Sequence, residues 1–330
     1  MKLDFIKKWN FLPKKILIVF SDPGGAKPLL SLAYYLKMEG KELKIISDRE
    51  YDFYNEFRLN VSKPQVVNDF ENFKPEVLIT GTSYTSNIEI QYIENAKKNG
   101  IISYSFIDHY TRIKNRFFNS NTYTLPNYII VIDKFAKNIA IKEGFKSNSV
   151  FIISNPYHYY LENWTPIINK KRLLDELGLM INKMIIVYAP DPISNAGGIE
   201  KFGTDEVQLS KFFMETLEEF ESHSNLQIIV VPHKNQNLSL LKNIFKGSIL
   251  NIHFFSSDKL IELLYFSDLV IGIFSNILVE ALVLKKPVLR ILNNISNDPF
   301  EKVQIGKLCY NKSQLKNQIV YNYNTFSKNN

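Results

Sequence analysis

The sequence predicts an α/β protein built from two doubly wound, Rossmann-like domains. Short, apolar, β-branched runs alternate with helical patterns, which is typical of parallel sheets covered by helices on both faces. The alternation restarts after a break at Asn155-Pro156. We therefore expect an N-terminal domain at residues 1–156, a linker at 157–182, a C-terminal domain at 183–316 and a frayed tail at 317–330. Since ligands of such sheets bind beyond the carboxyl ends of the strands, we also expect a central cleft between the domains.

The first half begins with a buried strand at residues 15–20 and a helix at residues 28–38. Pro28 suits the first turn of that helix, and the apolar residues after it recur at helical spacing. Further strands are expected at residues 43–47, 77–81, 101–107, 128–132 and 150–154, and further helices at 89–99 and 134–143.

The second half opens with a short helix at residues 170–177, which Gly178 ends. Apolar runs then predict strands at residues 183–189, 226–232, 249–254, 268–272 and 287–291. The segments between them predict helices at residues 205–221, 258–266 and 275–284.

Composition narrows the protein class. The formal net charge of +7 leaves an anionic partner open, but the lysines are scattered, which argues against nucleic acid. A single cysteine, Cys309, excludes a disulfide framework. No apolar run is long enough to span a bilayer, so we expect a cytoplasmic protein. The basic, aromatic start of the chain, which includes Trp9 and Phe11, either packs on the domain or touches the inner face of the membrane.

The loop after the first strand is a candidate anion site on the N-terminal side of the cleft. Gly24 and Gly25 let backbone N–H groups approach a ligand, and the following helix N-terminus favours negative charge. Asp22 and Lys27 flank the glycines, the former as a catalytic candidate and the latter as a contact to a leaving phosphate. A tight turn without a ligand is the alternative.

A second candidate follows the strand at residues 101–107. Asp108 and His109 are possible acid–base groups at the end of a buried strand, and Arg112 and Arg116 offer anion contacts downstream. The alternative is a surface loop with local hydrogen bonds.

The C-terminal half carries the sharpest pattern. A strand ends at Gly272, and Ser275 or Asn276 can cap the next helix, whose N-terminus suits a phosphate. Glu280, one turn inside that helix, suits ribose hydroxyls, although an exposed helix glutamate is the alternative. His233 and Lys234 end another strand and suit a phosphate or a ribose.

Several of these segments resemble the GT-B glycosyltransferases of bacterial surface-polysaccharide synthesis, a layout shared with UDP-GlcNAc 2-epimerases and CDP-glycerol-type transferases. The resemblance rests mainly on SDPGGAKPLLSLAYYL at residues 21–36, IDHYTRIKNRF at 107–117 and VIGIFSNILVEALVLKKPVLRI at 270–291. It implies that Gly272, Ser275, Asn276 and Glu280 hold the nucleotide of a nucleotide sugar, with His233 nearby.

The resulting expectation is an inverting, metal-independent glycosyltransferase without a cofactor. Asp108 or His109 would deprotonate a hydroxyl of a glycan or lipid-linked acceptor, which attacks the anomeric carbon of the nucleotide sugar. The alternatives are a UDP-GlcNAc 2-epimerase-like isomerase or hydrolase, in which carboxylates remove a proton from a sugar carbon, and a non-enzymatic anion-binding protein.

Overall fold

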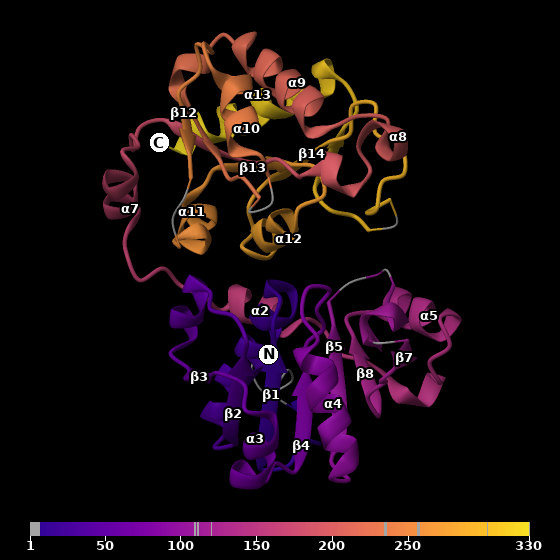
Figure 1. Cartoon of the computed structure of the whole chain (residues 1–330). Coiled ribbons are helices and arrows are strands. Elements are labelled where there is room, and N and C mark those ends of the chain that lie inside the picture. The colour runs from indigo at the N-terminus through magenta and orange to yellow at the C-terminus, as the bar shows by residue number, and fades with distance from the viewer. Residues whose placement is uncertain are drawn as a thin grey trace. The chain divides into compact units, whose positions relative to one another are not determined.

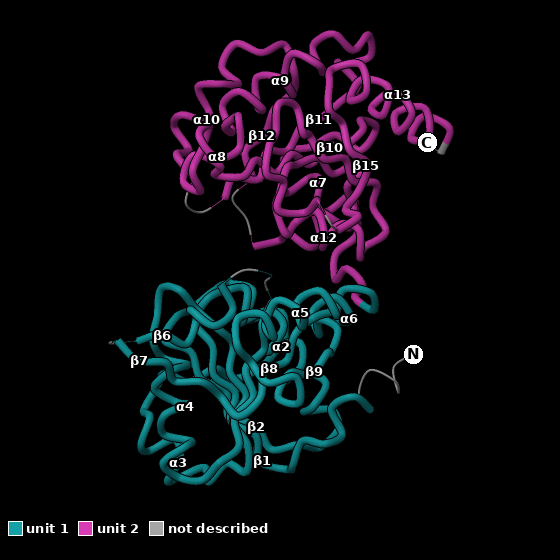
Figure 2. Tube along the Cα trace, turned by 90° about the vertical axis from the view of Figure 1, so that its right-hand side faces the viewer, with its two compact units in different colours: residues 1–163 teal, residues 164–330 magenta. Residues whose placement is uncertain are grey.

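The computed structural model describes residues 7–108, 110, 112–119, 121–233, 236–255, 258–301 and 303–329. The chain divides into two compact units, Met1–Asn163 and Trp164–Asn330 (Figure 2). Each unit is an α/β domain around its own parallel sheet (Figure 1). The predicted fold class of two Rossmann-like domains is therefore confirmed.

Unit 1 contains a seven-stranded parallel sheet in the order β3-β2-β1-β4-β5-β8-β9. The chain leaves β1 toward β2 on one side and later returns to β4 on the other, so the strand order reverses between β1 and β4. The strands are β1 (Lys15–Phe20), β2 (Glu42–Ser47), β3 (Val61–Ser62), β4 (Val77–Thr80), β5 (Ile102–Ile107), β8 (Tyr128–Val131) and β9 (Val150–Ile152). A small antiparallel pair, β6 (Phe118–Asn119) and β7 (Thr122–Tyr123), lies outside this sheet.

Helices cover the sheet of unit 1 because its strands are apolar on both sides. Leu17 and Val19 of β1 belong to a buried cluster with α3 (Val66–Phe73), α4 (Ile88–Lys98) and α5 (Lys134–Lys142). Successive side chains of a strand point to opposite faces, so Ile16 and Ile18 face the other side. The remaining helices are α2 (Pro23–Met38), which contacts β1, and α6 (Pro156–Glu162), which packs on α2.

Unit 2 repeats the plan with a six-stranded parallel sheet in the order β12-β11-β10-β13-β14-β15. Here the order reverses between β10 and β13. The strands are β10 (Met184–Ala189), β11 (Leu226–Val230), β12 (Ile252–Phe254), β13 (Leu269–Gly272), β14 (Val288–Ile291) and β15 (Lys307–Cys309). The helices are α7 (Lys170–Leu177), α8 (Gly198–Phe202), α9 (Glu206–Glu218), α10 (Leu238–Phe245), α11 (Leu260–Phe266), α12 (Asn276–Val283) and α13 (Lys312–Asn329).

The segment expected to be a frayed tail is helix α13 instead. Leu315 and Ile319 are buried in the same core as Phe213 of α9. The Asn-rich composition hid an apolar stripe at helical spacing, and its burial supplies the stability that composition alone did not indicate.

Helix α2 begins five residues earlier than expected, at Pro23. Asp22 is the extended N-cap residue, and Pro23 occupies the first helical position, where its missing N–H is harmless. Gly24 and Gly25 therefore lie in the first helical turn and do not form a loop.

The start of the chain packs on unit 1, as far as it is described. Trp9 is 1% exposed and Leu12 is buried, whereas Phe11 is half exposed. No helix within the described part of the chain combines the length and the apolar character needed to cross a bilayer.

Candidate functional site

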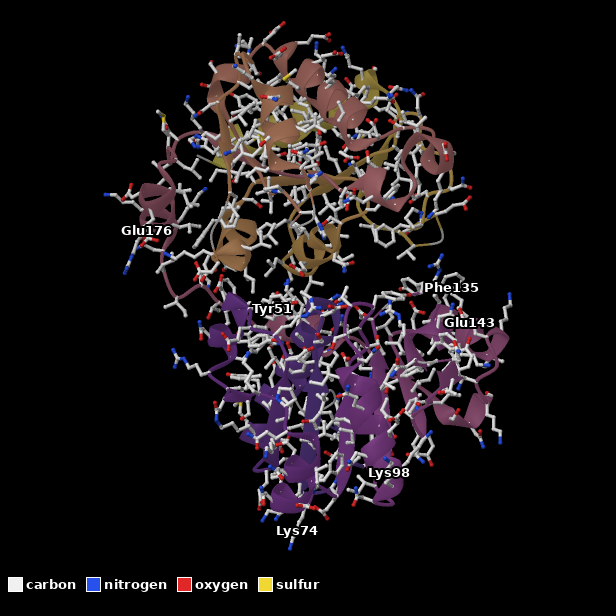
Figure 3. All side chains as sticks on the ribbon, in the orientation of Figure 1. Tyr51, Lys74, Lys98, Phe135, Glu143 and Glu176 are labelled. Carbon is white, nitrogen blue, oxygen red and sulfur yellow. The ribbon has the colours of Figure 1, made fainter. Side chains whose placement is uncertain are left out.

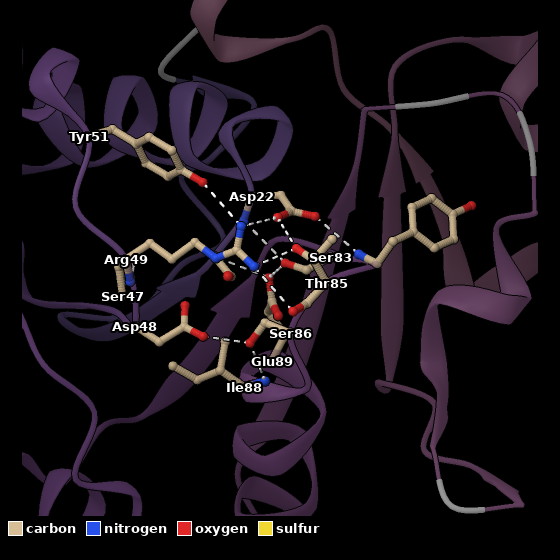
Figure 4. A network of polar contacts seen from close by, with 12 residues as sticks. Asp22, Ser47, Asp48, Arg49, Tyr51, Ser83, Thr85, Ser86, Ile88 and Glu89 are labelled. Carbon is tan, nitrogen blue, oxygen red and sulfur yellow. Dashed lines mark hydrogen bonds and ion pairs between the residues drawn. The ribbon is translucent and has the colours of Figure 1, made fainter. Parts of the chain in front are cut away.

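In unit 1, Asp22 ties together two loops where the strand order reverses. Its Oδ1 accepts a hydrogen bond from Thr85 Oγ1 at 2.7 Å and pairs with Arg49 Nη1 at 3.2 Å (Figure 4). Its Oδ2 accepts a hydrogen bond from the backbone N–H of Tyr84 at 3.1 Å. Because both oxygens are engaged, this geometry makes Asp22 a structural tie between the β1 and β4 loops and does not favour it as a base.

Glu89, on α4, lies buried beneath the same loops. Its Oε1 accepts hydrogen bonds from the backbone N–H of Ser21 at 3.1 Å and from Ser83 Oγ at 2.5 Å. Ser83 Oγ in turn accepts one from the N–H of Asp22 at 3.2 Å. Burial raises the pKa of the Glu89 carboxyl to about 7, and the bond from Ser83 opposes that shift.

Asp108 follows β5, and its side chain is 14% exposed. A Cβ added to Gly24 would lie 2.3 Å from Asp108 Oδ2, so the carboxylate can sit against the first turn of α2 only because residue 24 is glycine. The partial positive charge of a helix N-terminus stabilises a carboxylate there. A carboxylate of the chain itself thus lies beside Gly24, one of the two glycines where the sequence predicted a bound anion.

A buried arginine, Arg116, lies next to Asp108. Its Nη1 donates to Thr82 Oγ1 at 3.0 Å and is 3.9 Å from Asp108 Oδ1. It comes from the 3-10 helix η2 (Lys114–Phe117), whose residue Phe117 is buried in the core. The loops after β1, β4 and β5 therefore bring two carboxylates and a guanidinium to the same edge of the sheet.

Other residues expected on this side are placed differently. The Lys27 ammonium lies over the rings of Tyr157 and Phe53, at 4.9 and 5.9 Å from their centres. Arg112 is exposed and has a left-handed backbone with φ of 51°. His109 falls outside the described residues.

Two lysines of unit 1, Lys74 and Lys98, lie far from this edge. Figure 3 shows Tyr51 at the end of the unit where the loop after β2 lies, and Lys74 and Lys98 at the opposite end. Those two lysines follow or end α3 and α4. Part of the net positive charge is accordingly solvated surface away from the candidate site.

In unit 2, Asp191 links two neighbouring strand-end loops, as Asp22 does in unit 1. It follows β10, and its Oδ2 accepts a hydrogen bond from the backbone N–H of Phe274 at 2.8 Å, in the loop after β13. Burial raises the pKa of Asp191 to about 7, while hydrogen bonds from the N–H groups of residues 273–275 oppose that shift. The backbone N–H groups of this loop thus converge on one carboxylate of the chain, the arrangement by which nests of successive N–H groups hold anions.

The residues expected to hold the nucleotide surround this loop. Ser275 caps α12 by accepting from the N–H of Ile277 at 3.4 Å, and Asn276 is exposed. Glu280 is only 6% exposed, which excludes the alternative of an exposed helix glutamate. A Cβ on Gly272 would lie 2.9 Å from the carbonyl oxygen of Ala189, so this glycine permits close approach of β10 and β13.

His233 is exposed after β11, on the other side of β10 in the sheet. Its backbone N–H donates to Gln236 Oε1 at 2.9 Å. Lys234 falls outside the described residues. In unit 2 the predicted residues therefore follow two strands of the sheet. His233 follows β11, and Ser275, Asn276 and Glu280 follow β13.

Sequence reasoning named Arg116 but missed three other residues that organise these sites: Glu89, Asp191 and Arg290. Asp191 carries a usable signal, since it follows an apolar strand by two residues, as Asp22 does. Arg290 interrupts the apolar run of β14 and is fully buried, with Nε donating to the carbonyl oxygen of Ile273 at 2.8 Å. Within the described residues, no group of three or more His, Cys, Asp or Glu side chains is arranged to hold a metal ion.

The chain matches no family model, and no curated protein matches it in sequence. Solved structures do share its fold. UDP-GlcNAc 2-epimerase of Neisseria meningitidis, bound to UDP-GlcNAc, aligns with a TM-score of 0.67 at 15% identity over 95% of this chain and 93% of that one. The enzyme of Methanocaldococcus jannaschii gives 0.67 at 16% over 93% and 92%, and S. aureus MnaA, solved with UDP, gives 0.66 at 16% over 93% and 87%.

These neighbours correct the predicted activity. The chain was expected to be an inverting glycosyltransferase, but several of the solved structures that share its fold are UDP-GlcNAc 2-epimerases. The glycosyltransferase prediction is therefore wrong, and the epimerase alternative agrees better with these neighbours. At this level of identity the likeness establishes the fold.

Proposed function

We propose that this protein acts on a UDP-linked N-acetylhexosamine and inverts the sugar at C2. The observation that carries the proposal is Asp108, a partly exposed carboxylate that Gly24 admits to the first turn of α2. Support also comes from the fold, which is shared along nearly the whole chain with UDP-GlcNAc 2-epimerases.

Epimerisation at C2 requires a base and a leaving group, but it requires no acceptor molecule for the sugar. The hydrogen on C2 is not adjacent to a carbonyl, so its removal must accompany departure of UDP from C1. The base takes the proton, the C2–H electron pair forms a C1=C2 double bond, and the C1–O electron pair leaves with UDP. Return of a proton to the other face of C2, with re-addition of UDP, gives the epimer. The sum is redox-neutral, so no redox cofactor enters the proposal.

Asp108 is the proposed base for the C2 proton. Asp22 is not assigned this role, because both of its oxygens are held by the β4 loop and Arg49. In unit 2, we assign Ser275, Asn276 and Glu280 to the nucleotide, since the α12 N-terminus favours phosphate oxygens and a carboxylate can accept ribose hydroxyls. His233 is assigned to the same ligand from the end of β11.

The test is to incubate the full chain with UDP-GlcNAc in D2O and follow C2 by NMR. We expect deuterium at C2 and formation of the manno epimer, or release of UDP and free sugar if the enzyme is a hydrolase. Asp108→Asn should lower C2 exchange by at least about 100-fold, as expected when an acid–base group is lost. Asp175→Asn, on the exposed surface of α7, is the matched control and should retain full exchange.

Two results would contradict the proposal. One is full C2 exchange by a folded Asp108→Asn protein, which would remove the base assignment. The other is failure of the wild-type chain to bind UDP in calorimetry, which would remove the substrate class.

A further inference from the structure

Arg116 differs from the other deeply buried arginine of the chain in how its charge is compensated. In Arg290, Nε donates to the carbonyl oxygen of Ile273 and Nη2 lies 2.5 Å from Asp298 Oδ1. In Arg116, the side chain is 6% exposed, but its one hydrogen-bond partner in the described residues is the neutral hydroxyl of Thr82. Its Nε is buried and has no partner among them.

The nearest carboxylate does not complete the arrangement. Asp108 Oδ1 lies 3.9 Å from Arg116 Nη1, beyond hydrogen-bonding distance. The ring of Tyr84 lies 4.5 Å from Arg116 Cζ and stabilises the cation from its face, which fixes the guanidinium plane and leaves its edge donors for another group. A buried cation with unused donors is costly unless an anion completes its hydrogen bonds.

The surroundings place these donors where a ligand can reach them. Thr82 follows β4 and Asp108 follows β5, so the guanidinium lies at the carboxyl ends of neighbouring strands, the edge of a doubly wound sheet where ligands bind. Tyr84 is 56% exposed and Asp108 is partly exposed, so this edge meets solvent.

We propose that Arg116 binds an oxyanion of the substrate, a carboxylate on the sugar, beside the base Asp108. The planar fork of arginine matches the two oxygens of a carboxylate. The inference rests on the proposed function and deepens it: the substrate is a nucleotide-activated sugar acid. A phosphate of the nucleotide has the same oxyanion chemistry, and the arms of the experiment separate the two sources.

The experiment measures binding to the full-length chain by calorimetry with UDP, UDP-GlcNAc and its C6 carboxylate analogue, UDP-N-acetylglucosaminuronic acid. We expect the wild-type chain to bind the carboxylate analogue at least about tenfold more tightly than UDP-GlcNAc, the discrimination that about 1.4 kcal/mol provides. Arg116→Gln should abolish this preference and leave UDP affinity within about twofold. Arg58→Gln, an exposed arginine of the same unit, is the matched control and should behave as wild type.

The outcomes separate this inference from the proposed function. If Arg116→Gln loses affinity for UDP itself, Arg116 does bind an oxyanion, but that oxyanion is a phosphate of the nucleotide and not a carboxylate of the sugar. An unchanged ligand preference in a folded Arg116→Gln protein, or a wild-type preference for the neutral sugar, would overturn the inference even if UDP binds. Should Arg116→Gln fail to fold, Arg116→Lys keeps the charge without the fork, and the preference should fall at least about threefold; full retention would also overturn it.

Discussion

Glu89 shows how a buried carboxyl can hold together the loops of a candidate site. Both of its hydrogen bonds, from the N–H of Ser21 and from Ser83 Oγ, are accepted by Oε1. A proton on Oε2 therefore leaves the two loops tied together, and the protonated form suits the low-polarity surroundings that raise its pKa to about 7.

The pH dependence of stability follows from this shift. A carboxyl whose pKa is raised from 4.5 to about 7 in the folded state contributes stability fully below pH 4.5, and that contribution is lost as the pH rises through 7. Glu89→Gln keeps an oxygen for both hydrogen bonds and does not titrate. Relative to wild type, its free energy of unfolding should thus improve between pH 5 and pH 8, by at most about 3 kcal/mol.

Urea unfolding of wild type and Glu89→Gln at pH 5 and pH 8 measures the difference between their free energies of unfolding. Other titrating groups, such as Asp191, are present in both proteins, so their contributions cancel in this difference. Glu71→Gln, exposed on α3, is the control and should run parallel to wild type. If Glu89→Gln also runs parallel to wild type over this range, the Glu89 carboxyl has an ordinary pKa.

Some residues of the candidate site can be found from the sequence alone, and others cannot. Asp22 and Asp108 are found because each lies within two residues of the end of an apolar strand. Arg112 and Arg116 are equally plausible in sequence, and only the burial of Phe117 and its neighbours in the core shows which arginine points inward. Glu89 carries no such signal, since its role arises from loops that lie more than 60 residues before it and directly beside it.

At the scale of elements, the start of α2 has two glycines with different neighbours. A Cβ on Gly24 meets only the end of the Asp108 side chain, which can rotate away. A Cβ on Gly25 would lie 3.1 Å from the Cα of Gly81 and 3.4 Å from the N of Thr82, and this backbone cannot move without disturbing β4.

The two alanine variants should consequently have opposite effects. Gly24→Ala should displace the proposed base and lower C2 exchange by about 100-fold, with little change in the melting temperature. Gly25→Ala should cost about 1–3 kcal/mol of stability, the usual range for overpacking, and retain more activity per folded molecule. Thermal unfolding and the NMR exchange assay measure both effects; equal activity of Gly24→Ala and wild type would contradict the close fit at Asp108.

The elements that were predicted and those that were missed differ in where their stability originates. Strands such as β1 and β10 are continuous apolar runs and are readable from sequence alone. Helices α3 and α10 have only eight residues each and α13 is Asn-rich, and all three are held by a few side chains, such as Phe70, Leu241 and Leu315, that insert into a core formed by distant strands. That tertiary contribution is invisible in a local pattern.

At the scale of the whole molecule, the two units share one hydrogen-bonding arrangement. In each, an aspartate after the first central strand binds the loop after the neighbouring strand: Asp22 accepts from the N–H of Tyr84, and Asp191 from the N–H of Phe274. Both bonds lie where the strand order reverses. The units differ in what surrounds this tie, because unit 1 adds Asp108 and Arg116, whereas unit 2 adds the N-terminus of α12.

This difference predicts that the two parts of a nucleotide sugar protect different units from amide hydrogen exchange. UDP at about 100 times its Kd should stabilise what it binds by about 2.7 kcal/mol, so exchange that requires opening of that region slows about 100-fold. We expect UDP alone to protect peptides containing Phe274 and Glu280 in unit 2 and to leave those containing Ser83 and Arg116 unchanged. An intact UDP-sugar should protect both sets. Mass spectrometry of the full chain measures this, and protection by UDP alone confined to unit 1 would reverse the assignment of nucleotide and sugar to the two units.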